Sequence, residues 1–156
     1  MSEAGADEPK TWTDEELLAR FSGTKRRPPG SELLGFRMVR VNQADREVEV
    51  AFDATEQLTN PMKQIQGGYL CAMLDEVMSV ACMVASGMTA VAPTVEMKTS
   101  FYRPALPGVI RGVGRVARWG KTIAFTEGEL FDDQGRTLAK ATGTAIPTPF
   151  TSYKGK

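Results

Sequence analysis

Hydrophobic residues form one long run in the middle of the chain, and on both sides of it apolar and polar positions alternate. The run extends from Gly67 to Ser86, which is too long for a strand, and it predicts one long buried helix. Before it, residues 33–41 and 47–54 have the alternation of strands and enclose a polar turn at 42–46. These two segments predict an antiparallel hairpin with one face toward solvent.

After the run, the sequence returns to a period of two residues. Four further strands are predicted there, over residues 92–104, 108–119, 121–131 and 136–146, and Pro147 and Pro149 end the last of them. Near the amino terminus, Thr13 is followed three residues later by Glu16, a spacing typical of a capping box. Residues 13–22 are therefore predicted to form a short helix.

The predicted order is strand, strand, helix and four strands, an α+β arrangement whose connections suit antiparallel pairing. A six-stranded antiparallel sheet wrapped around the helix would bury most of its circumference, which explains why the run is apolar on nearly every side. A membrane span over residues 67–86 is the alternative. It conflicts with the adjacent acids Asp75 and Glu76, because a central aspartate costs about 2.5–3.5 kcal/mol in a bilayer. We therefore expect no membrane association.

The length of 156 residues suits a single folded domain. We divide the chain into an N-terminal segment with a short helix and a linker at 1–30, the domain at 31–148, and a C-terminal tail at 149–156. The first residues are acidic and polar and lack the basic and apolar regions of a secretory signal, which predicts a cytoplasmic location.

Composition excludes several classes of function. Lysine plus arginine equals aspartate plus glutamate at 19 each, so no overall positive charge favours nucleic acid, and we expect no nucleic-acid partner. The chain has no histidine, which excludes Ser-His-Asp and Cys-His nucleophile systems and histidine-ligated metals. Acid–base chemistry must therefore use carboxylates, and we expect neither a metal nor a cofactor. Cys71 and Cys82 are too far apart along the predicted helix for a disulfide and are interpreted as core residues.

One motif gives the chain a resemblance to a known family. The pattern Asn, five residues, His-Gly-Gly, six residues, Asp is met by Asn60, Gln66-Gly67-Gly68 and Asp75. Together with the strand order, it resembles the hotdog-fold thioesterases of the phenylacetate-pathway and human acyl-CoA thioesterase group, over residues 34–146. Gln66 is a departure, because the family usually has histidine there.

The resemblance implies a hotdog fold and hydrolysis of an acyl-CoA thioester. It makes Asp75 the nucleophile or the base for water, places Asn60 near the thioester or the water, and has Thr94 orient water from the partner subunit. Gln66 would contribute an amide to substrate binding. Family members are dimers or tetramers with the site between subunits, so a homo-oligomer, for example a homotetramer, is implied, with CoA entering only as part of the substrate.

Physical reasoning supports a role for the two glycines. A helix that begins at Gly67 and Gly68 presents unpaired N–H groups and a partial positive charge, and glycine allows close approach of a ligand to the backbone. Such N–H groups can form an oxyanion hole, although a Gly-Gly turn without chemical function would have the same sequence. Ser79, one turn after Asp75, is a candidate to bind that carboxylate or simply to pack against a neighbouring element.

Two questions stay open at this point. Arg103, Arg118 and Lys121 lie near strand ends, where they could meet the phosphates of CoA or could equally be solvated charges. The alternative function is a non-catalytic hotdog protein that binds acyl-CoA or a small acid, because a fold alone does not establish activity.

Overall fold

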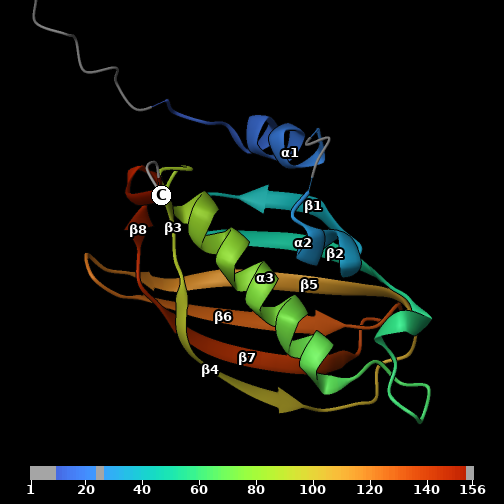
Figure 1. Ribbon diagram of the computed structural model, residues 1–156. Helices are drawn as coiled ribbons and strands as arrows, with labels where there is room; N and C mark the ends of the chain where they lie inside the picture. Colours follow the sequence, from blue (N-terminus) through green and yellow to red (C-terminus); the bar gives the residue numbers. More distant parts are fainter. Residues whose placement is uncertain (1–9, 24–26, 154–156) are drawn as a thin grey trace, which may run out of the picture.

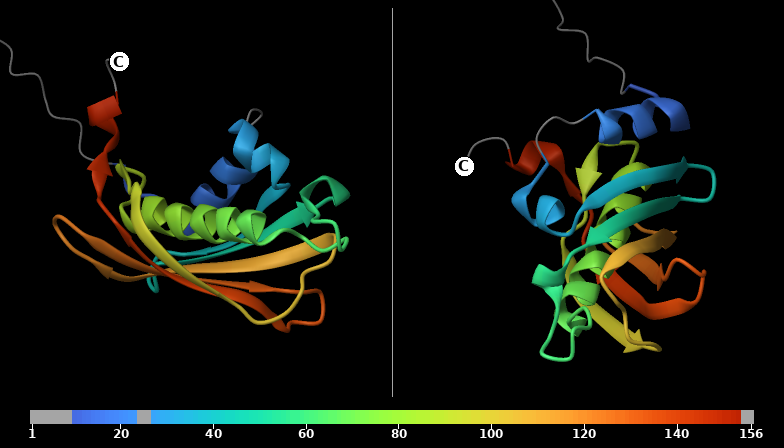
Figure 2. Two further views of the ribbon diagram at one scale, coloured as in Figure 1. Left: turned by 60° about the horizontal axis from the view of Figure 1, so that its bottom comes forward. Right: turned by 90° about the vertical axis from the view of Figure 1, so that its right-hand side faces the viewer.

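A curved sheet holds one long helix against its concave face. The computed structural model describes residues 10–23 and 27–153 of the chain. The long helix is α3 (Gly67–Ala85), and two short helices, α1 (Asp14–Ser22) and α2 (Pro29–Leu33), lie on the same side of the sheet as α3 (Figure 1, Figure 2). The predicted α+β hotdog arrangement is confirmed.

Six strands form the main sheet, and all neighbouring pairs are antiparallel. Their order in space is β1-β2-β5-β6-β7-β4. The strands are β1 (Phe36–Asn42), β2 (Glu47–Ala54), β4 (Thr94–Phe101), β5 (Gly108–Trp119), β6 (Ala124–Phe131) and β7 (Thr137–Ala145). A second sheet pairs β3 (Ala90–Val91) with β8 (Thr148–Pro149), and short 3₁₀ helices occupy Glu56–Leu58 and Phe150–Tyr153.

The two edges of the main sheet differ. At the β1 edge, α1 packs against the strand, and the Oδ1 atom of Asp14 accepts a hydrogen bond of 2.8 Å from Nε2 of Gln43. At the other edge, β4 pairs with β7 on one side only, and no strand among the described residues pairs with its outer side. Six of the eight residues of β4 are exposed, Val95 by 62% and Phe101 by 53%. β4 is therefore the open edge of the sheet.

Close packing of α3 on the sheet depends on a glycine in β5. A Cβ atom at Gly114 would lie only 2.3 Å from the carbonyl oxygen of Val77 in α3, so no other residue fits there without displacing the helix. The helix face toward the sheet carries fully buried apolar side chains, including Leu74 and Val77, which join the core formed by the strands.

Most predicted elements have the expected positions, with corrections at their ends. The capping box of Thr13 and Glu16 is present. The predicted linker is wrong at Pro29 and Gly30, which begin α2. Because α2 extends to Leu33, the first strand begins at Phe36 and not at residue 33. The strand predicted from residue 121 begins at Ala124. The short sheet β3-β8 was not predicted. The proposed segments 1–30 and 149–156 lie partly outside the described residues.

The apolarity of α3 belongs to the core of this fold. By length and composition alone the helix could cross a membrane, but half of its most apolar window is buried inside the protein. The continuous hydrophobic run is thus explained by packing against a curved sheet.

Candidate active site

The first turn of α3 begins at an exposed point of the molecule. Gln66 is its N-cap residue and has extended backbone angles, φ −63° and ψ 138°, but its side chain does not cap the helix. The first N–H groups of a helix have no partner within the helix, so those of Gly67 and Gly68 face outward from its positive end. A Cβ atom at Gly68 would meet nothing within 4 Å, so the space in front of this residue is open.

A pocket of about 340 Å³ opens beside Gly67. Leu70 and Phe101 contribute apolar walls, and a Cβ atom at Gly67 would lie 3.3 Å from Cζ of the Phe101 ring. Asn60 also lines the pocket, and its Oδ1 atom accepts hydrogen bonds from the backbone N–H groups of Met62 (2.9 Å) and Gln64 (3.2 Å). Asn60 therefore shapes the loop that borders the pocket, and it lies in the same pocket as Gly67.

The structure brings Asp75 and Thr94 together within one chain. The hydroxyl of Thr94 donates a hydrogen bond of 2.6 Å to Oδ1 of Asp75, which joins α3 to the first residue of β4. The family resemblance placed Thr94 in the partner subunit, whereas here it contacts the carboxylate of its own chain. A hydrogen bond to one carboxylate oxygen fixes the orientation of the group, and Oδ2 is then the oxygen that can act on a reactant.

Glu76 belongs to a different environment. Its Oε1 atom accepts a hydrogen bond of 2.7 Å from the hydroxyl of Ser31 in α2, and Ser31 is only 5% exposed. The carboxylate lines a mainly apolar pocket of about 250 Å³ between α3 and the N-terminal helices. Consecutive helix positions are about 100° apart, so Asp75 faces the β4 side of α3 and Glu76 the α2 side. Neither a partner residue for Glu76 nor a role for Ser31 was predicted from the sequence.

The remaining predicted residue, Ser79, lies one turn beyond Asp75. It is half-buried and makes no hydrogen bond to Asp75 within the part of the chain that the structure describes. One turn before Asp75, Cys71 contacts Thr99 of β4, with Sγ 3.6 Å from Oγ1. The other cysteine, Cys82, is buried in the core, and burial raises the pKa of its thiol to about 12.

Two groups of predicted residues are thus separated on one chain. Gly67 and Asn60 lie at the pocket, whereas Asp75 lies farther along the helix, where it contacts Thr94 of β4. Gly67 and Asp75 are eight positions apart in α3, which corresponds to about 12 Å along the helix axis. A donor to a carbonyl oxygen and a group that attacks its carbon must each lie about 3 Å from the reacting atoms. Gly67 and Asp75 of one chain therefore cannot act on the same carbonyl group.

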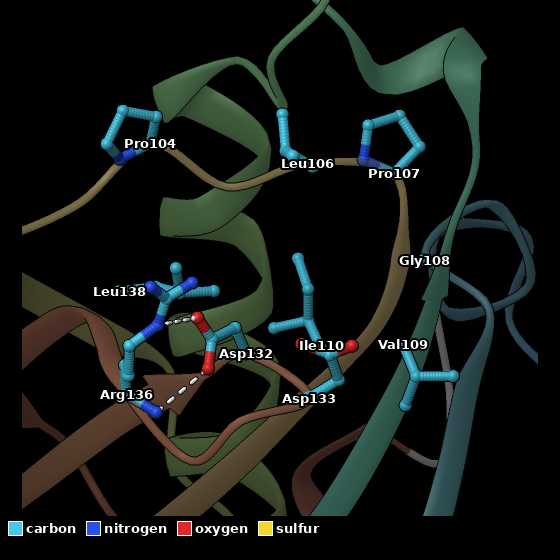
Figure 3. A pocket seen from close by; sticks show the side chains of 10 residues that line it. All are labelled: Pro104, Leu106, Pro107, Gly108, Val109, Ile110, Asp132, Asp133, Arg136 and Leu138. Carbon is cyan, nitrogen blue, oxygen red and sulfur yellow. Dashed lines mark hydrogen bonds and ion pairs between the residues drawn. The ribbon is translucent and has the colours of Figure 1, made fainter.

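A third pocket, of about 220 Å³, lies beside the loop that follows β4 (Figure 3). It shares Pro104 with the pocket at Gly67, but none of the predicted site residues lines it. Its polar side holds an ion pair of 2.7 Å between Nε of Arg136 and Oδ2 of Asp132.

Comparison with known proteins places the chain in a family. A sequence model described as the Thioesterase superfamily matches residues 64–139, which include the start of α3 and Asp75. A phenylacetic acid degradation-related protein of Ralstonia eutropha JMP134 is 32% identical, with 83% of this chain and 98% of that chain covered and a TM-score of 0.72.

Two other solved structures have the same architecture. A conserved protein of Pseudomonas aeruginosa is 28% identical, with 78% of this chain and 95% of that chain covered and a TM-score of 0.72. A Streptococcus mutans UA159 protein solved with acetyl-CoA bound is 20% identical, with 81% and 95% covered and a TM-score of 0.67, a likeness that concerns the fold alone.

Proposed function

The chain belongs to the hotdog-fold thioesterase superfamily, and on this premise we propose that it hydrolyses an acyl-CoA or aryl-CoA thioester to the free acid and CoA. One observation carries the proposal. The Asp75 carboxylate of α3 is held by a hydrogen bond from Thr94, and the exposed N-terminus of the same helix presents Gly67 at a pocket. The acetyl-CoA bound to the Streptococcus mutans protein supports CoA as the thiol part of the substrate.

A complete site needs two copies of the chain. β4 is the open edge, and a second copy related by a two-fold axis would pair with it antiparallel. This pairing brings the Thr94 end of one β4 next to the Phe101 end of the other. Because Asp75 bonds to Thr94 and Gly67 lies against Phe101, the Asp75 of one copy then approaches the Gly67 of the second copy. We therefore propose a homo-oligomer, a dimer or a tetramer built from dimers, with sites between subunits.

The chemistry follows from this arrangement. The N–H groups at the start of α3 in one copy donate hydrogen bonds to the thioester oxygen and stabilise the negative charge that develops on it. The Oδ2 atom of Asp75 in the other copy attacks the carbonyl carbon or removes a proton from the water that attacks it. If Asp75 removes a proton from water, the hydroxide adds to the carbonyl carbon, the carbon–sulfur bond breaks, and the thiolate of CoA takes up that proton as the acid is released. If Asp75 attacks the carbon itself, the thiolate leaves and a mixed anhydride forms, and a water molecule then hydrolyses the anhydride, which frees the acid, restores the carboxylate and supplies a proton to the thiolate. Thr94 keeps Asp75 oriented, and Asn60 with Gln66 borders the bound thioester.

The test compares the two adjacent acids. Asp75→Asn keeps the shape of the side chain and removes the charge, so turnover of an acyl-CoA should fall by at least roughly a hundredfold while the fold and the oligomer persist. Glu76→Gln serves as the matched control and should lose less than about tenfold, because Glu76 is bonded to Ser31 on the other side of the helix. Thiol release is measured with aryl, short, medium and long acyl-CoAs.

The outcomes separate the candidate functions. Loss of turnover in Asp75→Asn alone supports the assignment, and an inactive Glu76→Gln with an active Asp75→Asn would show that the site is assigned to the wrong acid. If the wild type binds acyl-CoA but releases no thiol with any member of the panel, the chain is a binding protein. A stable and active monomer in light scattering would refute the shared site.

A further inference from the structure

Two opposite charges on the open edge of the sheet have no partner in the chain. Glu96 and Lys98 of β4 are exposed, and within the described residues neither forms an ion pair. Their neighbours on β7 are the neutral residues Thr144 and Thr142. In the other five strands of the main sheet, by contrast, every charged side chain except Arg118 has an ion-pair partner. Both charges of β4 are therefore left for whatever covers its outer side.

The β4 edge is built in a way that permits pairing with another strand. It has eight residues and no proline, and its one irregularity lies between Thr94 and Glu96, so the rest of the strand is regular (Figure 1). Proteins usually block such an edge with proline, a bulge or charge. Because the two charges of β4 have opposite signs, they do not repel a second copy of the strand as two like charges would. A second copy of this chain is thus an occupant that the edge can accept.

A two-fold axis restricts how two β4 strands can be aligned. Residues directly opposite each other in an antiparallel pair lie on the same face of the sheet, so the axis must pass beside a residue that faces its own copy. The shared site proposed above brings the Thr94 end of one strand to the Phe101 end of the other. The axis then lies near the middle of β4, at Met97 or at Lys98.

The charges distinguish these two alignments. With Lys98 on the axis, two lysines would face each other, and Glu96 would face the neutral Ser100. With Met97 on the axis, Glu96 of each copy faces Lys98 of the other, which gives two ion pairs. Opposite charges directly across a strand pair stabilise it, and like charges destabilise it. Met97 itself is half-buried and packs against the core, so the axis would pass beside an apolar contact on the helix side of the sheet.

We propose that two copies of the chain pair through β4 with Met97 on the two-fold axis, and that ion pairs between Glu96 and Lys98 of opposite copies select this alignment. The inference rests on the function proposed above, because the alignment decides whether Asp75 of one copy reaches Gly67 of the other. Moving the axis from Met97 to Lys98 slides the strands past each other by two residues, about 7 Å. The reacting groups must lie within about 3 Å of the thioester, so Glu96 and Lys98 are positioning residues for a reaction that they do not touch.

Charge exchange tests the two ion pairs. Lys98→Glu sets acid against acid twice, and Glu96→Lys sets cation against cation twice, so each should raise the dimer Kd in sedimentation by about tenfold or more. The double variant E96K/K98E restores both pairs with reversed polarity and should return the Kd to about the wild-type value. An equimolar mixture of the two single variants should form hybrid dimers, in which both pairs are again attractive. Arg118→Glu is the matched control, because Arg118 is exposed and unpaired within the described residues but lies in the interior strand β5, and it should leave the Kd unchanged.

Cysteine cross-linking tests the alignment independently of charge. In a Cys71→Ser background, Met97→Cys places two thiols opposite each other across the axis, where the Cα atoms of a strand pair are about 4.5–5.5 Å apart and suit a disulfide. Oxidation with copper phenanthroline should therefore give covalent dimers on a non-reducing gel. Lys98→Cys is the matched variant and should cross-link far less, because its thiol faces Glu96 of the other copy. Circular dichroism verifies that both variants are folded.

The outcomes separate the alignment from the proposed hydrolysis, because both tests measure assembly and not turnover. If the wild type releases no thiol but the charge variants and cross-links behave as expected, the alignment is supported and the hydrolytic function is refuted. A monomeric wild type, a Kd unchanged in both single charge variants, or cross-linking through Lys98→Cys alone would overturn the proposal. Tighter association of Lys98→Gln than of the wild type would overturn it too, since Lys98 would then protect the edge against pairing.

Discussion

Replacement of Gly67 by proline would remove a single N–H group from the proposed site. Gly67 is the first residue of α3, a position where proline is well tolerated because its N–H has no partner within the helix. Gln66 before it has φ −63° and ψ 138°, the extended region that a residue preceding proline prefers. The backbone of the protein is thus already suited to proline, and α3 should begin where it does now.

The expected loss can be divided into a steric and an electrostatic part. Any Cβ atom at position 67 lies 3.3 Å from the ring of Phe101, so Gly67→Ala produces this contact while keeping the N–H group. We expect Gly67→Ala to lose less than about tenfold in kcat, because the ring can move by a few tenths of an ångström. Removal of one oxyanion donor costs about 10²–10³ in kcat, so Gly67→Pro should be lower than Gly67→Ala by about that factor.

The assay is steady-state release of CoA by the two purified variants, with circular dichroism and light scattering to verify fold and assembly. Equal kcat values for the proline and alanine variants would refute the reasoning, because the N–H group would then contribute nothing to the transition state. A proline variant that is folded, oligomeric and as active as the wild type would have the same consequence. A loss confined to KM would place the N–H group in substrate binding alone.

Four further outcomes are expected. The inactive Asp75→Asn and Gly67→Pro chains are mixed in equal amounts, unfolded and refolded together, and the mixture should recover about a quarter of wild-type activity per chain. Half of the dimers are then hybrids, and each hybrid has one intact site of two. No recovery would place the whole site in one chain. Thr94→Val should lower kcat by about tenfold and Thr94→Ser should restore it, measured with the same thioester. Burial raises the pKa of the Cys82 thiol to about 12, so this thiol should resist iodoacetamide at pH 8 until the protein unfolds. Because the thiol ionises at lower pH in the unfolded chain, the free energy of unfolding measured in urea titrations should fall as pH rises from 9 toward 12. Gly114→Ala should unfold at markedly lower temperature than the wild type, since its methyl group would overlap the carbonyl of Val77.

Elements with strong local signals were predictable from the sequence. The long apolar run gave α3 because no strand is that long, and the period of two gave the strands of the main sheet. The capping box of Thr13 and Glu16 located the start of α1, since both of its hydrogen bonds are between residues three positions apart. The adjacent acids of α3 lie in different environments, as helix geometry requires of consecutive positions about 100° apart.

Features that depend on distant contacts were not predictable in this way. α2 has five residues, and its Ser31 is buried against Glu76, 45 positions later in the chain. The two-residue strands β3 and β8 are too short to show any periodicity. The place of β4 at the open edge follows from the whole strand order, and it decides that Phe101 is exposed beside Gly67.

The two adjacent acids connect assembly with chemistry. Asp75 is oriented by Thr94, and Thr94 begins the strand that forms the open edge of the sheet. Glu76 is bonded to Ser31 of α2, on the side where the chain packs against itself. A movement of β4 relative to α3 would therefore change the orientation of Asp75 directly, whereas Glu76 would keep its partner. In the proposed assembly β4 also joins the two copies. The pairing of the two β4 strands that brings Gly67 of one subunit to the site therefore also fixes the position of Thr94, and with it the Asp75 carboxylate, in the other subunit.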